Sequence, residues 1–107
     1  MPTTIGTEST QDLVNDLCRD AVEQNRRAKQ TSGWARRAAY DRKCELLSLL
    51  LLMDHAEINS VEFWAGCPTV GLTLPSGDKL HAVITRLTPD AREVAFRRIE
   101  KFWKLAS

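Results

Sequence analysis

Apolar residues are concentrated in one stretch near the middle of the chain. Seven of the eight residues from Leu46 to Met53 are apolar, and Glu45 and Asp54 lie directly outside it. A segment with such continuous apolarity has to be covered on nearly every side. Leu and Met favour helix and no β-branched residue interrupts the stretch, so the pattern predicts a central helix rather than a buried strand. The stretch is too short to cross a bilayer, which needs roughly 20 apolar residues.

The N-terminal part of the chain has a helical repeat. Apolar residues recur every four positions from Leu13 to Ala21, which predicts a first helix over residues 9–30. Residues 1–8 lack this repeat and contain Pro and Gly, so we expect a flexible N-terminal arm. The rest of the chain, residues 9–107, has the length of a single domain.

A second helix is predicted from Trp34 to about Ile58, and it contains the apolar stretch. The break before it, Thr31-Ser32-Gly33, is short and offers hydroxyl groups for an N-cap. Because a connection of this length joins neighbouring antiparallel helices, we expect a helical hairpin.

A β-hairpin is predicted further along the chain. Apolar and polar residues alternate over residues 69–74 and again over residues 80–85, and Pro75-Ser76-Gly77 between them is typical of a turn. A three-residue loop pairs Leu72 with Leu80, which places both apolar rows on the same face of the sheet.

Two further elements complete the expected fold. Residues 61–65 are expected to form a short strand. A last helix is predicted to begin with Thr88 as N-cap and Pro89 in the first helical position, and apolar residues follow at helical spacing from Ala91 to Ala106. The sequence therefore predicts the α+β class, with an N-terminal antiparallel helical hairpin, a small antiparallel sheet and a closing amphipathic helix.

The charge of the chain is arranged in bands. Net charge is +1 overall, which gives no general attraction to nucleic acid or acidic membranes. Residues 1–24 and 44–84 each carry −4, residues 25–43 carry +6, and residues 85–107 carry +3. The basic band, residues 25–43, is therefore the sharpest feature of the charge pattern.

The basic band lies where the two predicted helices meet, so an antiparallel pair would gather its cations at one end. Trp34 and Tyr40 stand among these cations, and an aromatic residue among arginines is typical of an interaction surface. Arginine also suits bidentate contact with phosphate. Nucleic acid, another anionic partner, and a solvated helix end without a partner all fit this pattern. The candidate partner-binding residues are Arg26, Arg27, Lys29, Trp34, Arg36, Arg37, Tyr40, Arg42 and Lys43.

Catalytic and metal-binding patterns are absent from the sequence. His55 stands near Asp54 and Glu57, but these spacings do not place ligands on one helix face. A Cys67–His81 pair would need proximity in the fold. No nucleophile elbow, P-loop, metalloprotease or dinucleotide motif occurs, and no zinc-finger or RNA-binding signature supports the basic band. We therefore expect a non-enzyme without cofactor, metal or evident small-molecule substrate.

The number and spacing of the cysteines indicate the redox state of the cellular compartment. Cys18, Cys44 and Cys67 are odd in number and widely spaced, which favours free thiols in a reducing environment, although a single disulfide is an alternative. The N-terminus has no basic patch followed by an apolar run, so no signal peptide is expected. These features predict a cytoplasmic protein with no membrane-spanning segment.

Three functional hypotheses from different classes follow. The first hypothesis is a small non-enzymatic binding or regulatory protein that acts through protein–protein contacts, for example an inhibitor or accessory protein. The alternative is a nucleic-acid-binding regulator that uses the basic band. An enzyme or small-ligand binder built from dispersed residues such as Cys67 and His81 is a third hypothesis. The apolar stretch offers more surface than one small sheet and two amphipathic helices cover, so we also expect a homodimer.

Overall fold

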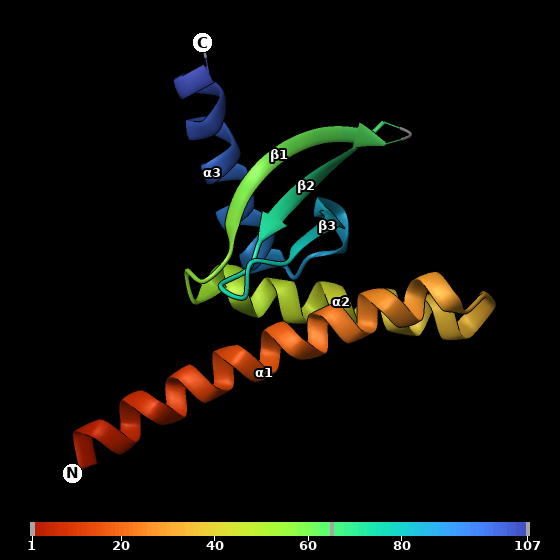
Figure 1. Ribbon diagram of the computed structural model, residues 1–107. Coiled ribbons are helices and arrows are strands. Elements are labelled where there is room, and N and C mark those ends of the chain that lie inside the picture. The colour runs from red at the N-terminus through yellow and green to blue at the C-terminus, as the bar shows by residue number, and fades with distance from the viewer. Residues whose placement is uncertain (1, 65, 107) are drawn as a thin grey trace.

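The computed structural model (Figure 1) describes the backbone of residues 2–64 and 66–106 and the side chains of residues 10–63 and 66–101. In chain order the elements are α1 (Pro2–Gln30), α2 (Gly33–Leu52), β1 (Glu57–Trp64), β2 (Cys67–Thr73), β3 (Lys79–Val83), a 3-10 turn η1 (Ile84–Arg86) and α3 (Pro89–Ala106). The three strands form one antiparallel sheet in the order β1-β2-β3. The predicted α+β class, with a helical hairpin, a small sheet and a closing helix, is confirmed.

The helix α2 is the centre of the molecule. It packs antiparallel to α1 on one side and contacts α3 on another, and the sheet lies over the helical hairpin (Figure 1). The N-terminal part of α1 extends past the end of α2 (Figure 1). The end of α1 and the start of α2 meet at the opposite tip of the hairpin, which is where the basic band lies.

The predicted apolar helix is confirmed, and most of it is buried. Leu46, Leu47 and Leu50 are fully covered by the sheet and the neighbouring helices. Leu49 and Leu52, however, are 45% and 46% exposed. The chain itself therefore covers only part of the apolar stretch.

The predicted hairpin and its register are also confirmed. Leu72 pairs with Leu80, and both side chains are buried in the core. Within the turn, the Gly77 N–H donates to the Leu74 carbonyl at 2.8 Å, and Gly77 has a φ of +90°, which favours glycine. Alternation and turn chemistry thus act together to place the apolar row on the core side.

The predicted end of the second helix near Ile58 is wrong, since α2 ends at Leu52 and Ile58 lies in β1. Asp54 takes a left-handed conformation with a φ of 62°. The His55 N–H then donates to the Leu50 carbonyl at 2.8 Å, while the Asp54 N–H donates to Leu51 at 3.1 Å, which is the Schellman arrangement. This C-cap closes the helix and frees the following residues for the sheet.

The other boundaries agree in part with the prediction. The closing helix begins at Pro89 as predicted. The strand expected at residues 61–65 is longer and begins at Glu57. The helix α1 begins at Pro2, so it includes residues 2–8, where we expected an arm; the expected flexibility of that segment stays a prediction. Among the described residues, no helix is long and apolar enough to cross a membrane.

Candidate functional site

The tip of the helical hairpin brings the basic band together. The helices α1 and α2 meet there, and the Arg36 Nε donates to the Ala28 carbonyl across the turn at 2.9 Å. Trp34 stands at the start of α2 with 87% of its surface exposed. The predicted clustering of these cations at one end of the molecule therefore has a structural basis.

Three of the seven predicted cations are neutralised by acidic neighbours. Arg26 and Arg27 both pair with Glu23, one turn earlier on α1. The Arg26 guanidinium holds the pKa of the Glu23 carboxyl below its ordinary value by a hydrogen bond and its charge. Arg42 lies 3.2 Å from Glu45 and 3.7 Å from Asp20. These three arginines therefore contribute little free positive charge.

The other four predicted cations surround a hollow of about 450 Å³ between the helical hairpin and η1. We call this space the basic hollow. Its charged lining residues are Lys29, Arg36, Arg37, Lys43 and Arg86, with Asp41 as the one carboxylate among the described residues that line it. Arg86 Nη1 lies 3.8 Å from Asp41 Oδ1. Arg86 comes from η1, far along the chain, and no local sequence signal points to it.

Lys43 is the buried cation of the basic hollow. Its side chain is only 5% exposed, and its Nζ donates to Asn25 Oδ1 at 3.3 Å and lies 4.5 Å from the centre of the Tyr40 ring. No described carboxylate forms an ion pair with it. Burial lowers the pKa of the Lys43 ammonium, and the positive charge of Lys29 acts in the same direction. The hollow therefore contains a buried positive charge without an opposite charge beside it.

Tyr40 joins α2 to the sheet. Its hydroxyl accepts a hydrogen bond from the Val83 N–H at 3.1 Å, and burial raises its pKa. This contact makes Tyr40 partly structural, unlike the exposed Trp34. A second hollow of about 370 Å³ shares Tyr40 and Lys43 with the basic hollow and is also lined by Thr69, His81 and Val83.

The fold does not bring Cys67 and His81 together. Cys67 is the first residue of β2, whereas His81 pairs with Gly71, four residues further along that strand. At about 3.3 Å per residue, the two positions lie roughly 13 Å apart along the sheet. The Cys67–His81 pair therefore has no geometry for nucleophilic catalysis.

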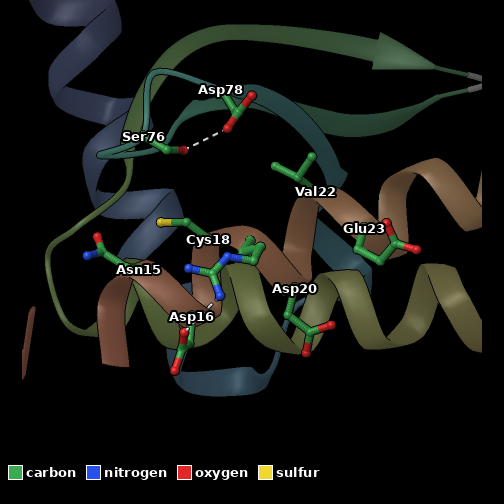
Figure 2. Close-up of a pocket in the computed structure, with 9 residues that line it drawn as sticks. Asn15, Asp16, Cys18, Asp20, Val22, Glu23, Ser76 and Asp78 are labelled. Carbon is green, nitrogen blue, oxygen red and sulfur yellow. Dashed lines mark hydrogen bonds and ion pairs between the residues drawn. The ribbon is translucent and has the colours of Figure 1, made fainter. Parts of the chain in front are cut away.

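Another hollow, of about 830 Å³, lies between α1 and the loop that follows β2, and the sequence pattern did not point to it. Figure 2 shows Cys18 of α1 facing the loop that carries Ser76 and Asp78. The Ser76 hydroxyl donates to Asp78 Oδ2 at 2.7 Å. Burial raises the pKa of the Cys18 thiol, although hydrogen bonding to Ser76 acts in the opposite direction. Because thiols react as thiolates, this environment disfavours a nucleophilic cysteine.

The acidic side chains in the described part of the chain do not gather into a metal site. Among the described residues, no three His, Cys, Asp or Glu side chains are placed to hold a metal ion. Asp54, the sequence neighbour of His55, instead accepts a hydrogen bond from Arg98 Nη2 at 2.6 Å. Its position thus serves the turn after α2.

No protein family, curated protein or solved structure matches this chain in the comparisons made. Of the surfaces described above, the hairpin tip is the one that combines unpaired cations with an exposed aromatic side chain.

Proposed function

We propose that this chain is a non-enzymatic binding protein that docks an acidic segment of a partner protein on the tip of its helical hairpin. The observation that carries the proposal is the exposed Trp34 on the same hairpin tip as three exposed cations that form no ion pair with a described carboxylate, namely Lys29, Arg36 and Arg37. Aromatic and arginine side chains supply most of the binding energy in protein interfaces. A regulatory or accessory role is the natural use of such a surface.

A protein partner is better supported than a nucleic acid. Non-specific binding to a duplex draws its affinity from many phosphate contacts along the backbone. Four of the seven predicted cations are not free for such phosphate contacts. Three of them, Arg26, Arg27 and Arg42, pair with acidic side chains, and the fourth, Lys43, is buried. The remaining charge is compact, which suits a few carboxylates or one strongly charged group on a protein surface.

The test is capture of a partner from nuclease-treated host lysate by the wild type, by Trp34→Ala and by Phe63→Ala. Phe63 is also an exposed aromatic, 62% accessible, but lies on β1 away from the hairpin tip. We expect Trp34→Ala to lose the partner and Phe63→Ala to retain it. Melting temperatures should barely change, because exposed substitutions alter stability by about 0.5 kcal/mol or less.

Two outcomes would count against this proposal. Equal capture by both variants would remove the hairpin tip as the docking surface. Capture from untreated lysate but not from nuclease-treated lysate, together with salt-dependent mobility shifts of DNA or RNA, would favour the alternative nucleic-acid-binding function.

We further propose that the protein works in the cytosol and as a homodimer. Cys18, Cys44 and Cys67 are free thiols, which supports a reducing compartment. The exposed Leu49 and Leu52 support a second copy as an additional partner.

A further inference from the structure

We propose that the basic hollow binds one phosphate group, supplied either by free inorganic phosphate or by a phosphorylated side chain of the docked partner. The inference rests on the proposed function for the second source alone, because binding of the free ion needs no partner. It names the chemical group that the hairpin tip recognises.

Positive charge predominates around the basic hollow. Five cations and one carboxylate line it, and the cations come from α1, α2 and η1. Separate elements thus place cations around one hollow, where a bound anion would offset their mutual repulsion. A single carboxylate would compensate only a small part of this positive charge. A phosphate carries up to two negative charges and has three or more acceptor oxygens.

Lys43 places a buried ammonium group at the basic hollow. A charged group out of water is costly unless an opposite charge or several hydrogen bonds compensate it. Asn25 supplies one long hydrogen bond of 3.3 Å, and the Tyr40 ring supplies a cation–π contact. A phosphate oxygen beside Nζ would supply the missing charge. This buried ammonium distinguishes the hollow from an ordinary group of surface cations.

Arg36 and Arg37 offer hydrogen-bond donors that suit a phosphate. Arg36 uses its Nε for the Ala28 carbonyl, which leaves its terminal nitrogens for a ligand. Arg37 has no partner among the described residues and offers a complete guanidinium fork. Arginine forks bind phosphate by two parallel hydrogen bonds, and lysine adds a point charge. A hollow of about 450 Å³ has room for a phosphate and for the end of the side chain that carries it.

The experiment is calorimetric titration of the full chain with inorganic phosphate and with acetyl-phosphoserine amide, against sodium chloride at equal ionic strength. We expect saturable binding of at least one phosphate probe and none of chloride. Equal affinity for both probes would assign the site to free phosphate, whereas tighter binding of the phosphoserine compound would assign it to a phosphorylated partner.

Matched variants test the location. Arg37→Gln and Arg26→Gln each remove one exposed cation. Arg37 lines the basic hollow, whereas Arg26 lies outside it and pairs with Glu23. We expect Arg37→Gln to weaken phosphate binding about tenfold and Arg26→Gln to leave it nearly unchanged. Lys43→Met should also weaken it while the protein stays folded, as its circular dichroism spectrum will show.

Absence of saturable binding of either phosphate probe, or equal weakening by Arg26→Gln and Arg37→Gln, would overturn the inference. The proposed function fails separately. Trp34 does not line the basic hollow, so Trp34→Ala should keep phosphate binding even though it loses the partner protein.

Discussion

At the scale of single residues, Lys43 stores an unfavourable charge in the folded chain without ligand. We expect Lys43→Met to raise the free energy of unfolding at pH 7 by about 1 kcal/mol, because Met keeps the apolar stem and removes the buried ammonium. Burial lowers the pKa of Lys43 in the folded state below the ordinary 10.5. As pH rises through that lowered value, the unfolded chain binds more protons than the folded one, so the wild type gains stability.

The difference between wild type and Lys43→Met should therefore shrink between neutral and alkaline pH. Urea unfolding at pH 7 and at a pH nearer 10.5 measures it. Burial raises the pKa of Tyr40 and of Cys44, and both residues remain in the variant, so the Lys43 ammonium is the titrating group that the two proteins do not share. A variant that is less stable at neutral pH, or a difference that widens with pH, would contradict this account.

Ser48 is a second residue whose role depends on its neighbours. It is the one polar residue within the apolar stretch and is fully buried. Its hydroxyl donates to the Cys44 carbonyl at 2.7 Å and accepts from the Thr88 N–H at 3.0 Å, immediately before α3 begins. We expect Ser48→Ala to lower the free energy of unfolding by about 1–3 kcal/mol, because it leaves the Thr88 N–H without its acceptor.

Chemical denaturation of Ser48→Ala measures this loss, and Ser60→Ala on β1 is a control at a serine outside the core. An unchanged midpoint in Ser48→Ala would show that water replaces the hydroxyl at the start of α3.

At the scale of elements, Arg98 of α3 holds the turn between α2 and β1. Its guanidinium donates to the Ala56 carbonyl at 2.8 Å and to Asp54 Oδ1 at 2.6 Å. We expect Arg98→Leu to cost about 2 kcal/mol of stability, because Ala56 is buried and its carbonyl would lose its partner. Thermal unfolding compared with Arg97→Leu tests this prediction.

Arg97 is the matched control for Arg98. It makes one exposed ion pair with Glu93 at 3.6 Å, on the same helix. Exposed pairs contribute well under 1 kcal/mol, so Arg97→Leu should change stability little. Equal losses in the two variants would mean that a charge on α3, rather than the contact with the turn, is what matters.

The elements that the sequence predicted well are those with a local signal. The apolar helix, the pairing of Leu72 with Leu80 and the start of α3 at Pro89 each follow from periodicity or turn chemistry within a few residues. The end of α2 was missed because Asp54, rather than Gly, takes the left-handed position, and Arg98 from another element supports it.

The candidate site shows the same division. The basic band was visible in the sequence, and the antiparallel hairpin explains why its cations gather. The sequence does not show which of these cations form ion pairs, because some pairs join two helices. Arg42 of α2, for example, pairs with Asp20 of α1. Arg86 and the burial of Lys43 likewise depend on how η1 and the sheet pack against α2.

At the scale of the whole molecule, both helices of the helical hairpin expose leucine side chains in the isolated chain. Leu49 and Leu52 are spaced by three residues on α2, so they share one side of the helix, and Leu13 of α1 is 51% exposed. The adjacent charges are balanced, because Asp16 pairs with Arg19 on α1 and Arg42 with Glu45 on α2. A face with both signs of charge can meet its own copy around a two-fold axis without net repulsion.

We therefore predict a homodimer through this face, and the double variant Leu49→Lys/Leu52→Lys tests it. Burying the exposed half of a leucine is worth about 1 kcal/mol. A two-fold interface contains each leucine twice, so the double variant should weaken the dimer by about a thousandfold. Light scattering coupled to size-exclusion chromatography at micromolar concentration should give a dimer for the wild type and a monomer for the variant.

Phe96→Lys is the control, because Phe96 is 50% exposed on α3 and beside Phe63 rather than on the hairpin face. The helical content of the double variant should stay that of the wild type, since neither Leu49 nor Leu52 belongs to the buried core. A monomeric wild type would leave the hairpin face without a second copy as partner. A dimer that survives the double variant but is lost in Phe96→Lys would move the interface to α3 and β1.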